Sequence, residues 1–211
     1  MADHRIVAAI YDWFLAGTER GGLRQMRADL LRGAEGRTLE LGAGTGLNLA
    51  HYTSSVTELV LTEPDRFMAA RLRKRLAGEP PPVASVEVID TTAEELPFED
   101  ASFDTVVATL VFCTVEDPAK AMAEAARVLR PEGRLLYLEH VRSPDSERLA
   151  RWQDRLERPW GRFAGGCHPN RPTGETLSSA GLEMERLDRG RMPKAAPWVR
   201  PLISGSARPG P

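Results

Sequence analysis

Short apolar runs alternate with segments of helical period along most of the chain. The runs typical of buried strands span 37–41, 58–62, 83–89, 105–110 and 134–141. Between the last two, apolar residues at helical spacing predict a helix over 117–129, which Asp117 caps and Pro118 opens. This alternation predicts an α/β fold with a mostly parallel sheet and helices on both faces.

Both ends of the chain add elements to this pattern. The spacing of apolar residues predicts helices over 3–16, 19–33 and 146–160. Pro64 in a first turn and the basic residues at 71–75 in a last turn predict a further helix over 64–76, and a short helix is expected over 173–180. Further predictions are a short helix from Leu47, a turn at 131–133, and a closing β pair over 184–189 and 199–207.

Composition narrows the function classes. The 211 residues fit one domain with a substantial core. With 28 basic and 30 acidic residues the net charge is −2, so no basic surface indicates nucleic acid binding. No apolar stretch approaches the roughly 20 residues of a membrane span, and no secretory signal is recognisable, so we expect a cytoplasmic protein. Two cysteines, Cys113 and Cys167, indicate neither a disulfide framework nor a zinc cluster, and no metal is expected.

The segment Leu39–Asn48, LELGAGTGLN, carries the main chemical signal. A strand that runs into a glycine-rich turn predicts a nucleotide-binding corner, because glycine lets the backbone approach a ligand closely. The dinucleotide fingerprint places glycine first, third and sixth, whereas here the sixth position is Leu47. The spacing therefore disfavours NAD and FAD, and with them an oxidoreductase. A glycine-rich turn without a ligand is the alternative.

Glu63 follows the loop at the end of the second predicted strand, 17 positions after Gly46. A carboxylate at this place can accept hydrogen bonds from both hydroxyls of a ribose. Because Pro64 follows, a helix N-cap is the alternative, and both roles are compatible.

The glycine loop resembles motif I of the class I S-adenosylmethionine (SAM) methyltransferases. Three later segments resemble the remaining motifs in the same order, namely 90–98, 102–113 and 127–135. The resemblance implies a Rossmann-like fold with seven mostly parallel strands, helices on both faces and an antiparallel last strand. It implies SAM as cofactor and S-adenosylhomocysteine as product. We expect a single domain over 1–211, with covering helices in 1–33 and an acceptor-side insertion in 142–180.

The same resemblance assigns cofactor contacts. Glu40 is expected to orient the loop and the methionine ammonium, and the loop after the third strand is expected to hold adenine. Many relatives have Asp where Thr92 stands. A buried carboxyl bonded only to backbone is the alternative for Glu40, and core packing is the alternative for Tyr11 and Cys113. The expected cofactor residues are Tyr11, Glu40, Gly42, Ala43, Gly44, Thr45, Gly46, Asn48, Glu63, Pro64, Thr92, Ala93, Glu94, Thr109, Leu110, Val111 and Cys113.

A narrower resemblance extends over nearly the whole chain. Glu139-His-Val, the W-x-x-x-L-x-x-P-W segment 152–160, Gly166-Cys through Arg171 and the segment 199–205, together with 109–113, resemble the alkyl thiol methyltransferases of the methyltransferase-like 7 group. The resemblance implies a small thiol acceptor. Those proteins carry an apolar N-terminal membrane segment that this sequence lacks, so we expect a soluble relative. The candidate substrate residues are Trp13, Trp152, Trp160 and His168.

The acceptor decides whether a general base is needed. Thiols titrate near pH 8.5, so a thiol acceptor needs little help, whereas an alcohol needs a base. His140 is the first candidate base and His168 the second, although a structural role is the commoner one for a lone histidine. Oxygen or nitrogen methylation of a natural product or phospholipid headgroup is the alternative reaction. A non-catalytic SAM-binding regulator is the alternative class, and the sequence does not set the oligomeric state.

Overall fold

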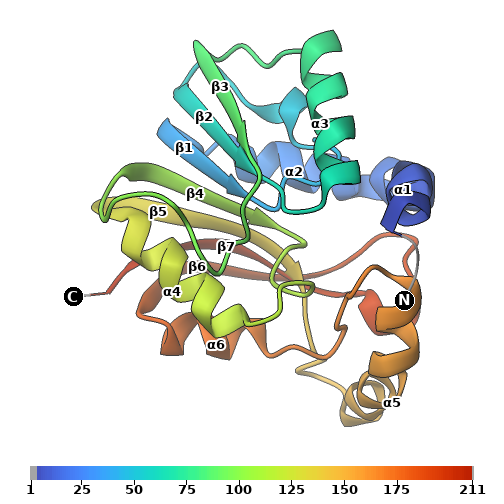
Figure 1. Cartoon of the computed structure of the whole chain (residues 1–211). Helices are drawn as coiled ribbons and strands as arrows, with labels where there is room; N and C mark the ends of the chain where they lie inside the picture. Colours follow the sequence, from blue (N-terminus) through green and yellow to red (C-terminus); the bar gives the residue numbers. More distant parts are fainter. Residues whose placement is uncertain (1–3, 211) are drawn as a thin grey trace.

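A seven-stranded sheet forms the centre of the molecule (Figure 1). The computed structural model describes residues 4–210, and their side chains from residue 11 onward. The strands are β1 Gly36–Leu41, β2 Val56–Thr62, β3 Ser85–Ile89, β4 Phe103–Thr109, β5 Leu129–His140, β6 Leu182–Arg191 and β7 Pro201–Pro209. Their order is β3-β2-β1-β4-β5-β7-β6, and β7 runs antiparallel to both of its neighbours. The predicted fold class is confirmed.

Three of the helices begin at a side-chain cap that the sequence supplies. Asp65 accepts hydrogen bonds from the first backbone N–H groups of α3, and Asp117 and Ser146 do the same for α4 and α5. The helices are α1 His4–Thr18, α2 Arg24–Leu31, α3 Arg66–Gly78, α4 Pro118–Val128, α5 Glu147–Phe163 and α6 Thr173–Ser179. Shorter helical turns are η1 Glu19–Leu23, η2 Leu49–His51 and η3 Pro197–Val199. Among the described residues, no helix has both the length and the apolar character to cross a membrane.

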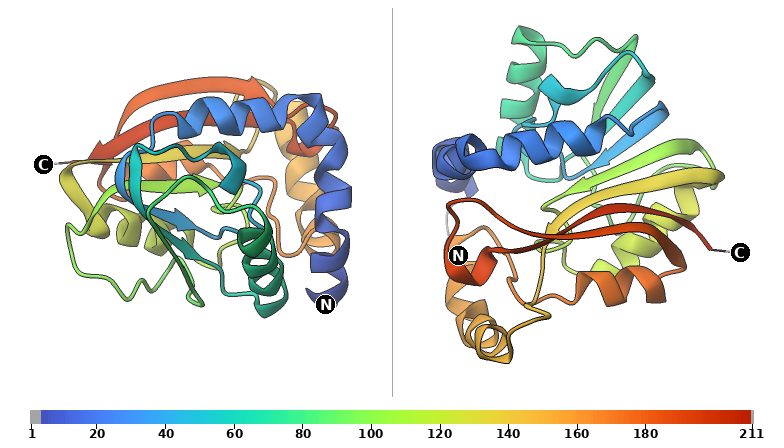
Figure 2. Two further views of the ribbon diagram at one scale, coloured as in Figure 1. Left: turned by 90° about the horizontal axis from the view of Figure 1, so that it is seen from above. Right: turned by 180° about the vertical axis from the view of Figure 1, so that it is seen from behind.

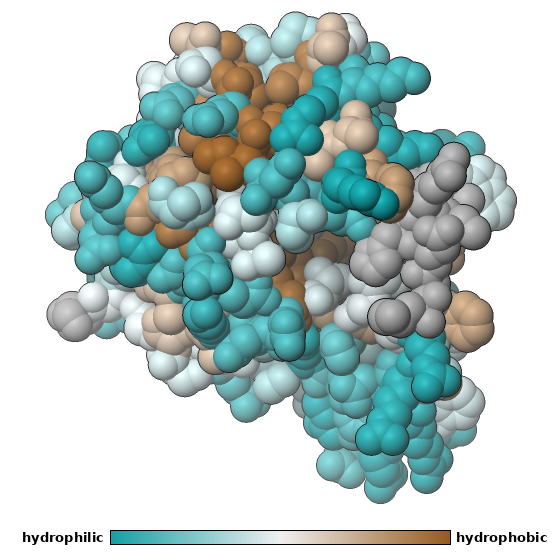
Figure 3. Space-filling view, in the orientation of Figure 1, coloured by the Kyte–Doolittle hydropathy of each residue, from teal (hydrophilic) through white to brown (hydrophobic). Residues whose placement is uncertain are grey.

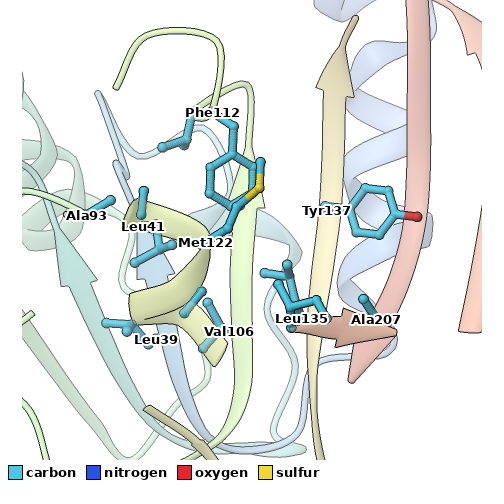
Figure 4. Close-up of a cluster of buried hydrophobic side chains, with 14 of the residues drawn as sticks. Leu39, Leu41, Ala93, Val106, Phe112, Met122, Leu135, Tyr137 and Ala207 are labelled. Atoms are coloured by element: carbon cyan, nitrogen blue, oxygen red, sulfur yellow. The ribbon is translucent and has the colours of Figure 1, made fainter. Parts of the chain in front are cut away.

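Two hydrophobic clusters cover the two faces of the sheet. On one face, α4 and α6 pack against side chains such as Val106 and Tyr137, with Met122 between them and the strands (Figure 4). On the other face, Leu31 of α2 and Leu72 of α3 belong to a second cluster, and Figure 2 shows α2 crossing that face. Each buried aliphatic side chain contributes about 1.5–3 kcal/mol, so these helices are fixed to the sheet that positions the site.

The segment after β5 is tied back to the sheet by Gln153 of α5. Its side-chain amide is fully buried and donates to the carbonyls of Val141, Pro169 and Trp198, at 3.0, 2.8 and 2.9 Å. Its carbonyl oxygen accepts from the backbone N–H of Ser143 at 2.7 Å. The outer surface of α5, at the lower right of the molecule, is hydrophilic (Figure 3). One buried amide therefore holds together the end of β5, α5 and the loop that follows it.

Two local predictions differ from the structure. The helix expected from Leu47 is only the turn η2, because this stretch forms i→i+3 bonds such as Leu49 N–H to the carbonyl of Gly46. The turn expected at 131–133 lies within β5, whose pairing with β4 shifts there. A Cβ on Gly133 would lie 2.9 Å from the carbonyl oxygen of Asp104, so the two backbones approach closely at this irregularity.

Candidate active site

The glycines of the loop after β1 differ in how closely other atoms surround them. Gly42, Gly44 and Gly46 all have positive φ, at 54°, 59° and 82°. A Cβ on Gly46 would lie 2.8 Å from Leu72 and 2.9 Å from Leu49, so the absent side chain lets the loop pack on α3. At Gly44 a Cβ would meet only one backbone oxygen, 4.0 Å away. Gly44 therefore leaves room for a ligand, whereas Gly46 serves the packing of the loop.

A cavity of about 30 Å³ lies over this loop, at the carboxyl ends of the neighbouring strands β1 and β4. Its lining residues are Tyr11, Arg27, Glu40, Gly42, Ala43, Gly44, Thr45, Leu47, Asn48, Thr109 and Leu110. Most of them were expected from the sequence as cofactor contacts. The expected contacts outside this lining are Gly46, Glu63, Pro64, Thr92, Ala93, Glu94, Val111 and Cys113.

Glu40, the next-to-last residue of β1, carries a buried carboxyl at the cavity. Tyr52 donates its hydroxyl to one carboxyl oxygen at 2.6 Å, and the Asn48 amide donates to the other at 2.9 Å. The alternative of a carboxyl bonded only to backbone is therefore wrong. Burial raises the pKa of Glu40 to about 7, although both hydrogen bonds act in the opposite direction. The carboxyl can accept a cation by losing its proton near neutral pH.

Arg27 of α2 supplies a buried cation to the same cavity, which the sequence did not reveal. Its guanidinium donates to the side-chain oxygens of Asn48 at 3.1 Å and Thr109 at 2.9 Å. A second nitrogen forms an ion pair with Glu19 at 3.0 Å. The side chain is only 4% exposed. Since Asn48 also donates to Glu40, a cation and an ionisable carboxyl lie on either side of one amide.

Glu63 lies against the glycine loop. One carboxyl oxygen accepts from the backbone N–H of Gly44 at 2.8 Å, and the other accepts from that of Asp65 at 2.9 Å. Asp65, rather than Glu63, is the N-cap of α3, with hydrogen bonds from the N–H groups of Phe67 and Met68. Burial raises the pKa of Glu63, and the two backbone donors oppose this effect. Each carboxyl oxygen retains capacity for a further donor.

Helix α1 closes the cavity from the N-terminal side. Asp12 accepts from the hydroxyl of Thr45 in the glycine loop at 2.5 Å and from Arg75 of α3 at 2.5 Å. Tyr11 lines the cavity. Burial raises the pKa of Tyr11, Arg27 lowers it, and charge on Cys113 or Cys167 raises it further. Asp12 thus fixes α1 against the glycine loop, where Tyr11 reaches the cavity.

The loop after β3, expected to hold adenine, makes mainly structural contacts in this state. Ala93 is buried in the hydrophobic cluster beneath α4, and Thr92 is exposed. A carboxyl oxygen of Glu94 accepts from the backbone N–H groups of Glu116 and Asp117 at 2.7 and 3.3 Å. Glu94 therefore links this loop to the start of α4. The adenine role stays a prediction, as does that of the exposed Pro64.

The chain turns sharply after β4, where Leu110 adopts φ of 59°. This turn directs the backbone N–H groups of Val111 and Phe112 at one carboxyl oxygen of Glu139, at 2.8 and 3.1 Å. Burial raises the pKa of Glu139 to about 7. Its other oxygen and His140 Nδ1 are both buried without a hydrogen-bond partner among the described residues. Glu139, in the neighbouring strand β5, thus fixes the backbone that follows β4.

Three residues from distant parts of the chain converge beside this turn. The sulfurs of Cys113 and Cys167 and a ring nitrogen of His140 all lie within 4.8 Å of one another. His140 Nε2 is 3.0 Å from the Cys167 sulfur, to which the Trp160 indole N–H donates at 3.3 Å. The Cys113 sulfur is 3.5 Å from the carbonyl oxygen of Leu110, which lines the cavity. This cluster, named here the Cys-His-Cys cluster, adjoins the glycine-loop cavity through Leu110, although none of its three side chains lines that cavity.

Only one of the candidate substrate residues contacts the cluster through its side chain. Trp160 packs edge-on against Trp198, with ring centroids 5.5 Å apart, and its ring lies 6.5 Å from that of Phe14. Trp13 and Trp152 are 79% and 51% exposed. The ring of His168, partly exposed, pairs with Glu157 at 2.9 Å, although its backbone N–H donates to the carbonyl of Cys113.

A second cavity, of about 300 Å³, lies between α6, β6 and the start of the segment after β5. Its lining includes Val141, Thr173, Met184 and Ile203, and it shares no residue with the lining of the glycine-loop cavity. None of the expected cofactor residues lines this second cavity, so the candidate nucleoside site is the glycine loop.

Comparisons with known proteins agree with this architecture. The family described as "Methyltransferase domain" matches residues 39–137. The human thiol S-methyltransferase TMT1B is 34% identical over 181 residues, which cover 84% of this chain and 73% of that protein. A SAM-dependent methyltransferase from Thermotoga maritima, described as a possible histamine N-methyltransferase, has a TM-score of 0.68 at 23% identity over 96% of both chains. Geranyl diphosphate methyltransferase in complex with SAM has a TM-score of 0.67 at 15% identity, over 90% of this chain and 85% of that one.

The fold and these matches define a SAM-dependent methyltransferase, and SAM is its cofactor. The residues around this cavity fit the amino acid end of that cofactor, because Gly44 leaves open space and Arg27 and Glu40 offer opposite charges. The chain belongs to the methyltransferase family that includes the thiol S-methyltransferases.

Proposed function

We propose that this chain transfers the methyl group of SAM to the sulfur of a small, largely apolar thiol. The observation that carries the proposal is the 34% identity, over 84% of the chain, to a protein named as a thiol S-methyltransferase. The aromatic wall of Trp160, Trp198 and Phe14 beside the Cys-His-Cys cluster supports an apolar acceptor. The cytoplasmic location expected from the sequence stays a prediction.

The methionine part of SAM lies between Arg27 and Glu40 in this proposal. The guanidinium of Arg27 binds the carboxylate of SAM, because charge-assisted hydrogen bonds of this kind are the strong ones. The carboxylate of Glu40 binds the ammonium, and Asn48 between them keeps both side chains in place. Thr109 and Leu110, at the end of β4, then lie beneath the methyl group.

The adenosine part extends from Gly44 toward Glu63. The carboxyl of Glu63 is already fixed by two backbone N–H groups, so it can accept the ribose hydroxyls without further ordering. The residues Thr92, Ala93 and Glu94 follow β3 at the same edge of the sheet, and we assign the adenine ring to this loop. Their contacts with the start of α4 fix the backbone that would meet the ring.

SAM supplies a methyl group that is already activated by the positive sulfur. The chain has to hold the acceptor sulfur in line with that methyl group and exclude water, and such positioning can contribute roughly 7–11 kcal/mol. Asp12, through its bonds to Thr45 and Arg75, holds α1 over the site and serves the exclusion of water. Thiols, such as that of cysteine near pH 8.5, are far more acidic than alcohols, so a thiol acceptor needs less help from a general base than an alcohol does.

A panel of acceptors tests the proposal. Release of S-adenosylhomocysteine is measured with aliphatic thiols, phenols, primary amines and phosphatidylethanolamine at equal concentration. We expect turnover with the thiols to exceed that with every other class by at least about tenfold. Greater turnover of a phenol or an amine contradicts the thiol assignment. SAM binding without turnover of any class supports a non-catalytic regulator instead.

A further inference from the structure

The Cys-His-Cys cluster has the composition and size of a metal site. Zinc prefers thiolate and imidazole ligands, at about 2.3 Å for sulfur and about 2.0–2.1 Å for nitrogen. Tetrahedral geometry at these lengths separates neighbouring donor atoms by about 3.4–3.8 Å. The three donor atoms of Cys113, His140 and Cys167 lie within 4.8 Å of one another, and the pair formed by His140 Nε2 and the Cys167 sulfur is 3.0 Å apart. Small side-chain rotations would bring all three to zinc distances.

The three donors are held by separate parts of the fold. His140 is the last residue of β5 and pairs with Leu202 of β7. Cys113 follows the turn after β4, and its carbonyl accepts from the N–H of His168 at 2.8 Å. Cys167 follows α5, and its sulfur accepts from the Trp160 indole. A hydrogen bond to a ligand sulfur from the surrounding side chains is the kind of contact that orients metal ligands.

The cluster stands next to the place assigned to the reacting methyl group. Cys113 contacts Leu110, which lines the cavity together with Tyr11. We propose that Cys113, His140 and Cys167 bind a zinc ion, and that its fourth ligand position receives the sulfur of the acceptor thiol. The fourth ligand rests on the proposed thiol acceptor, whereas the three-ligand site does not. This site departs from the expectation drawn from only two cysteines in the sequence.

In the proposed step the acceptor sulfur replaces the SAM sulfur on the methyl carbon. The acceptor R–SH binds the ion as R–S⁻ and releases its proton to solvent. Its sulfur forms a new bond to the methyl carbon while the bond from that carbon to the SAM sulfur breaks, and the electron pair stays on S-adenosylhomocysteine. The product thioether is neutral and therefore a weaker ligand than the thiolate, which favours its departure.

A disulfide between Cys113 and Cys167 is the competing use of the same sulfurs. It needs an oxidant and would employ only two of the three groups, leaving His140 Nε2 beside a disulfide sulfur that carries no charge. A metal ion uses all three donors. The two cases differ in mass and in metal content, so one protein sample distinguishes them.

The first experiment uses the full chain, purified under reducing conditions, with zinc and with cobalt(II) as a spectroscopic probe. We expect stoichiometric zinc by elemental analysis, and a tetrahedral cobalt spectrum with a sulfur-to-metal charge-transfer band. We also expect zinc to protect both cysteines from a thiol reagent in the unsubstituted protein. Absence of stoichiometric binding, or a Cys113–Cys167 disulfide in the reduced sample, overturns the proposal.

Single variants then assign the ligands. Cys113→Ser, Cys167→Ser and His140→Gln are each expected to weaken zinc binding by about 100-fold or more, since each removes one of three ligands. The matched control is His168→Gln, which changes a nearby histidine whose ring bonds Glu157 instead. Equal metal affinity in the three variants and the control overturns the site. The protection experiment on the unsubstituted protein decides the matter if a variant fails to fold.

The second experiment tests the fourth position without turnover. An alkanethiol is added to the cobalt-loaded protein in the presence of S-adenosylhomocysteine, and the matching alcohol is the control ligand. A change in the charge-transfer band with the thiol alone supports thiolate ligation. An unchanged spectrum at thiol concentrations that saturate methylation refutes the fourth-ligand assignment. If thiols are not methylated at all but cobalt binds as expected, the proposed function has failed and the metal site stands.

Discussion

Proton release on SAM binding tests the role given to Glu40. Burial raises the pKa of this carboxyl to about 7. An ammonium group beside it would favour the carboxylate and lower that pKa again. The protein therefore has to lose a proton from Glu40 when it binds SAM below neutral pH, and the affinity has to fall as the pH falls.

The size of the effect follows from the pKa. With a pKa of about 7, the Glu40 carboxyl is ionised to about 90% at pH 8 and to about 10% at pH 6. If only the carboxylate binds SAM, the dissociation constant rises about tenfold from pH 8 to pH 6. Close to 0.9 proton is released per SAM bound at pH 6, and about half a proton at pH 7.

Titration calorimetry in two buffers of different protonation enthalpy measures this release directly. The α-amino group of SAM also titrates, near pH 7.7–8.0, so the ligand contributes its own pH dependence. Glu40→Gln keeps the ligand's contribution and removes that of the protein. Glu139→Gln is the matched control, because the Glu139 carboxyl is also buried with a pKa of about 7 but lies outside the cavity lining.

Two results would refute this reasoning. The first is an unchanged proton release at pH 6 in Glu40→Gln. The second is a loss of that release in Glu139→Gln with Glu40 intact. Either result means that Glu40 does not face the cation of the ligand, and the orientation proposed for the methionine group is then wrong.

Four further predictions follow from the contacts of the site. Alanine at Gly44 or Gly46 has to adopt a positive φ, and at Gly46 it also overpacks against α3, so Gly46→Ala should destabilise the fold by about 1–3 kcal/mol more than Gly44→Ala. Gly44→Ala should instead weaken SAM binding more than Gly46→Ala does, and equal effects on stability and binding in both variants would contradict this division. Arg27→Gln should weaken S-adenosylhomocysteine by about tenfold or more and leave 5′-methylthioadenosine, which lacks the amino acid group, nearly unaffected in a binding assay. Glu63→Gln should weaken S-adenosylhomocysteine by about tenfold and its 2′-deoxy analogue by less, and equal losses for both ligands would exclude a contact with that hydroxyl. The pKa of Glu139 is raised from the ordinary 4.5 to about 7 in the folded protein, so the contribution of Glu139 to stability falls as the pH rises from about 4.5 through 7. Glu139→Gln should therefore raise the melting temperature more at pH 8 than at pH 5.

Most of the sheet could be predicted because its strands are short apolar runs. The strands β1, β2 and β4 are mostly buried, so an apolar run such as 105–110 indicated a strand even though its partner strands were unknown. The conformation of the stretch after the glycine loop could not be predicted from an apolar run. Its conformation depends on Leu49 packing against Gly46 and on successive tight turns, which no periodicity records.

Some residues of the site could likewise be predicted from the sequence, and others could not. The glycine loop and Glu63 are close in sequence, and their spacing carries the signal. Arg27 is one of many arginines and meets Thr109 only in the folded chain. The Cys-His-Cys cluster joins a strand end, a β4 turn and a loop after α5, so its members show no metal-binding spacing. Contacts of this kind depend on tertiary structure, and two isolated cysteines gave no indication of them.

Under the proposed function, the pairing of charges in the SAM complex would favour a sulfur acceptor over an amine. In the proposed complex the carboxylate of SAM pairs with Arg27 and its ammonium with Glu40, so the positive sulfur is the charge left without a partner. A thiolate brings the opposite charge to it, and methyl transfer then converts two charged groups into two neutral ones. Such a step gains from the low-dielectric surroundings that Trp160 and Trp198 provide, since little water has to reorganise there. An amine has to arrive neutral and leave charged, so its approach gains nothing from the charge of the positive sulfur.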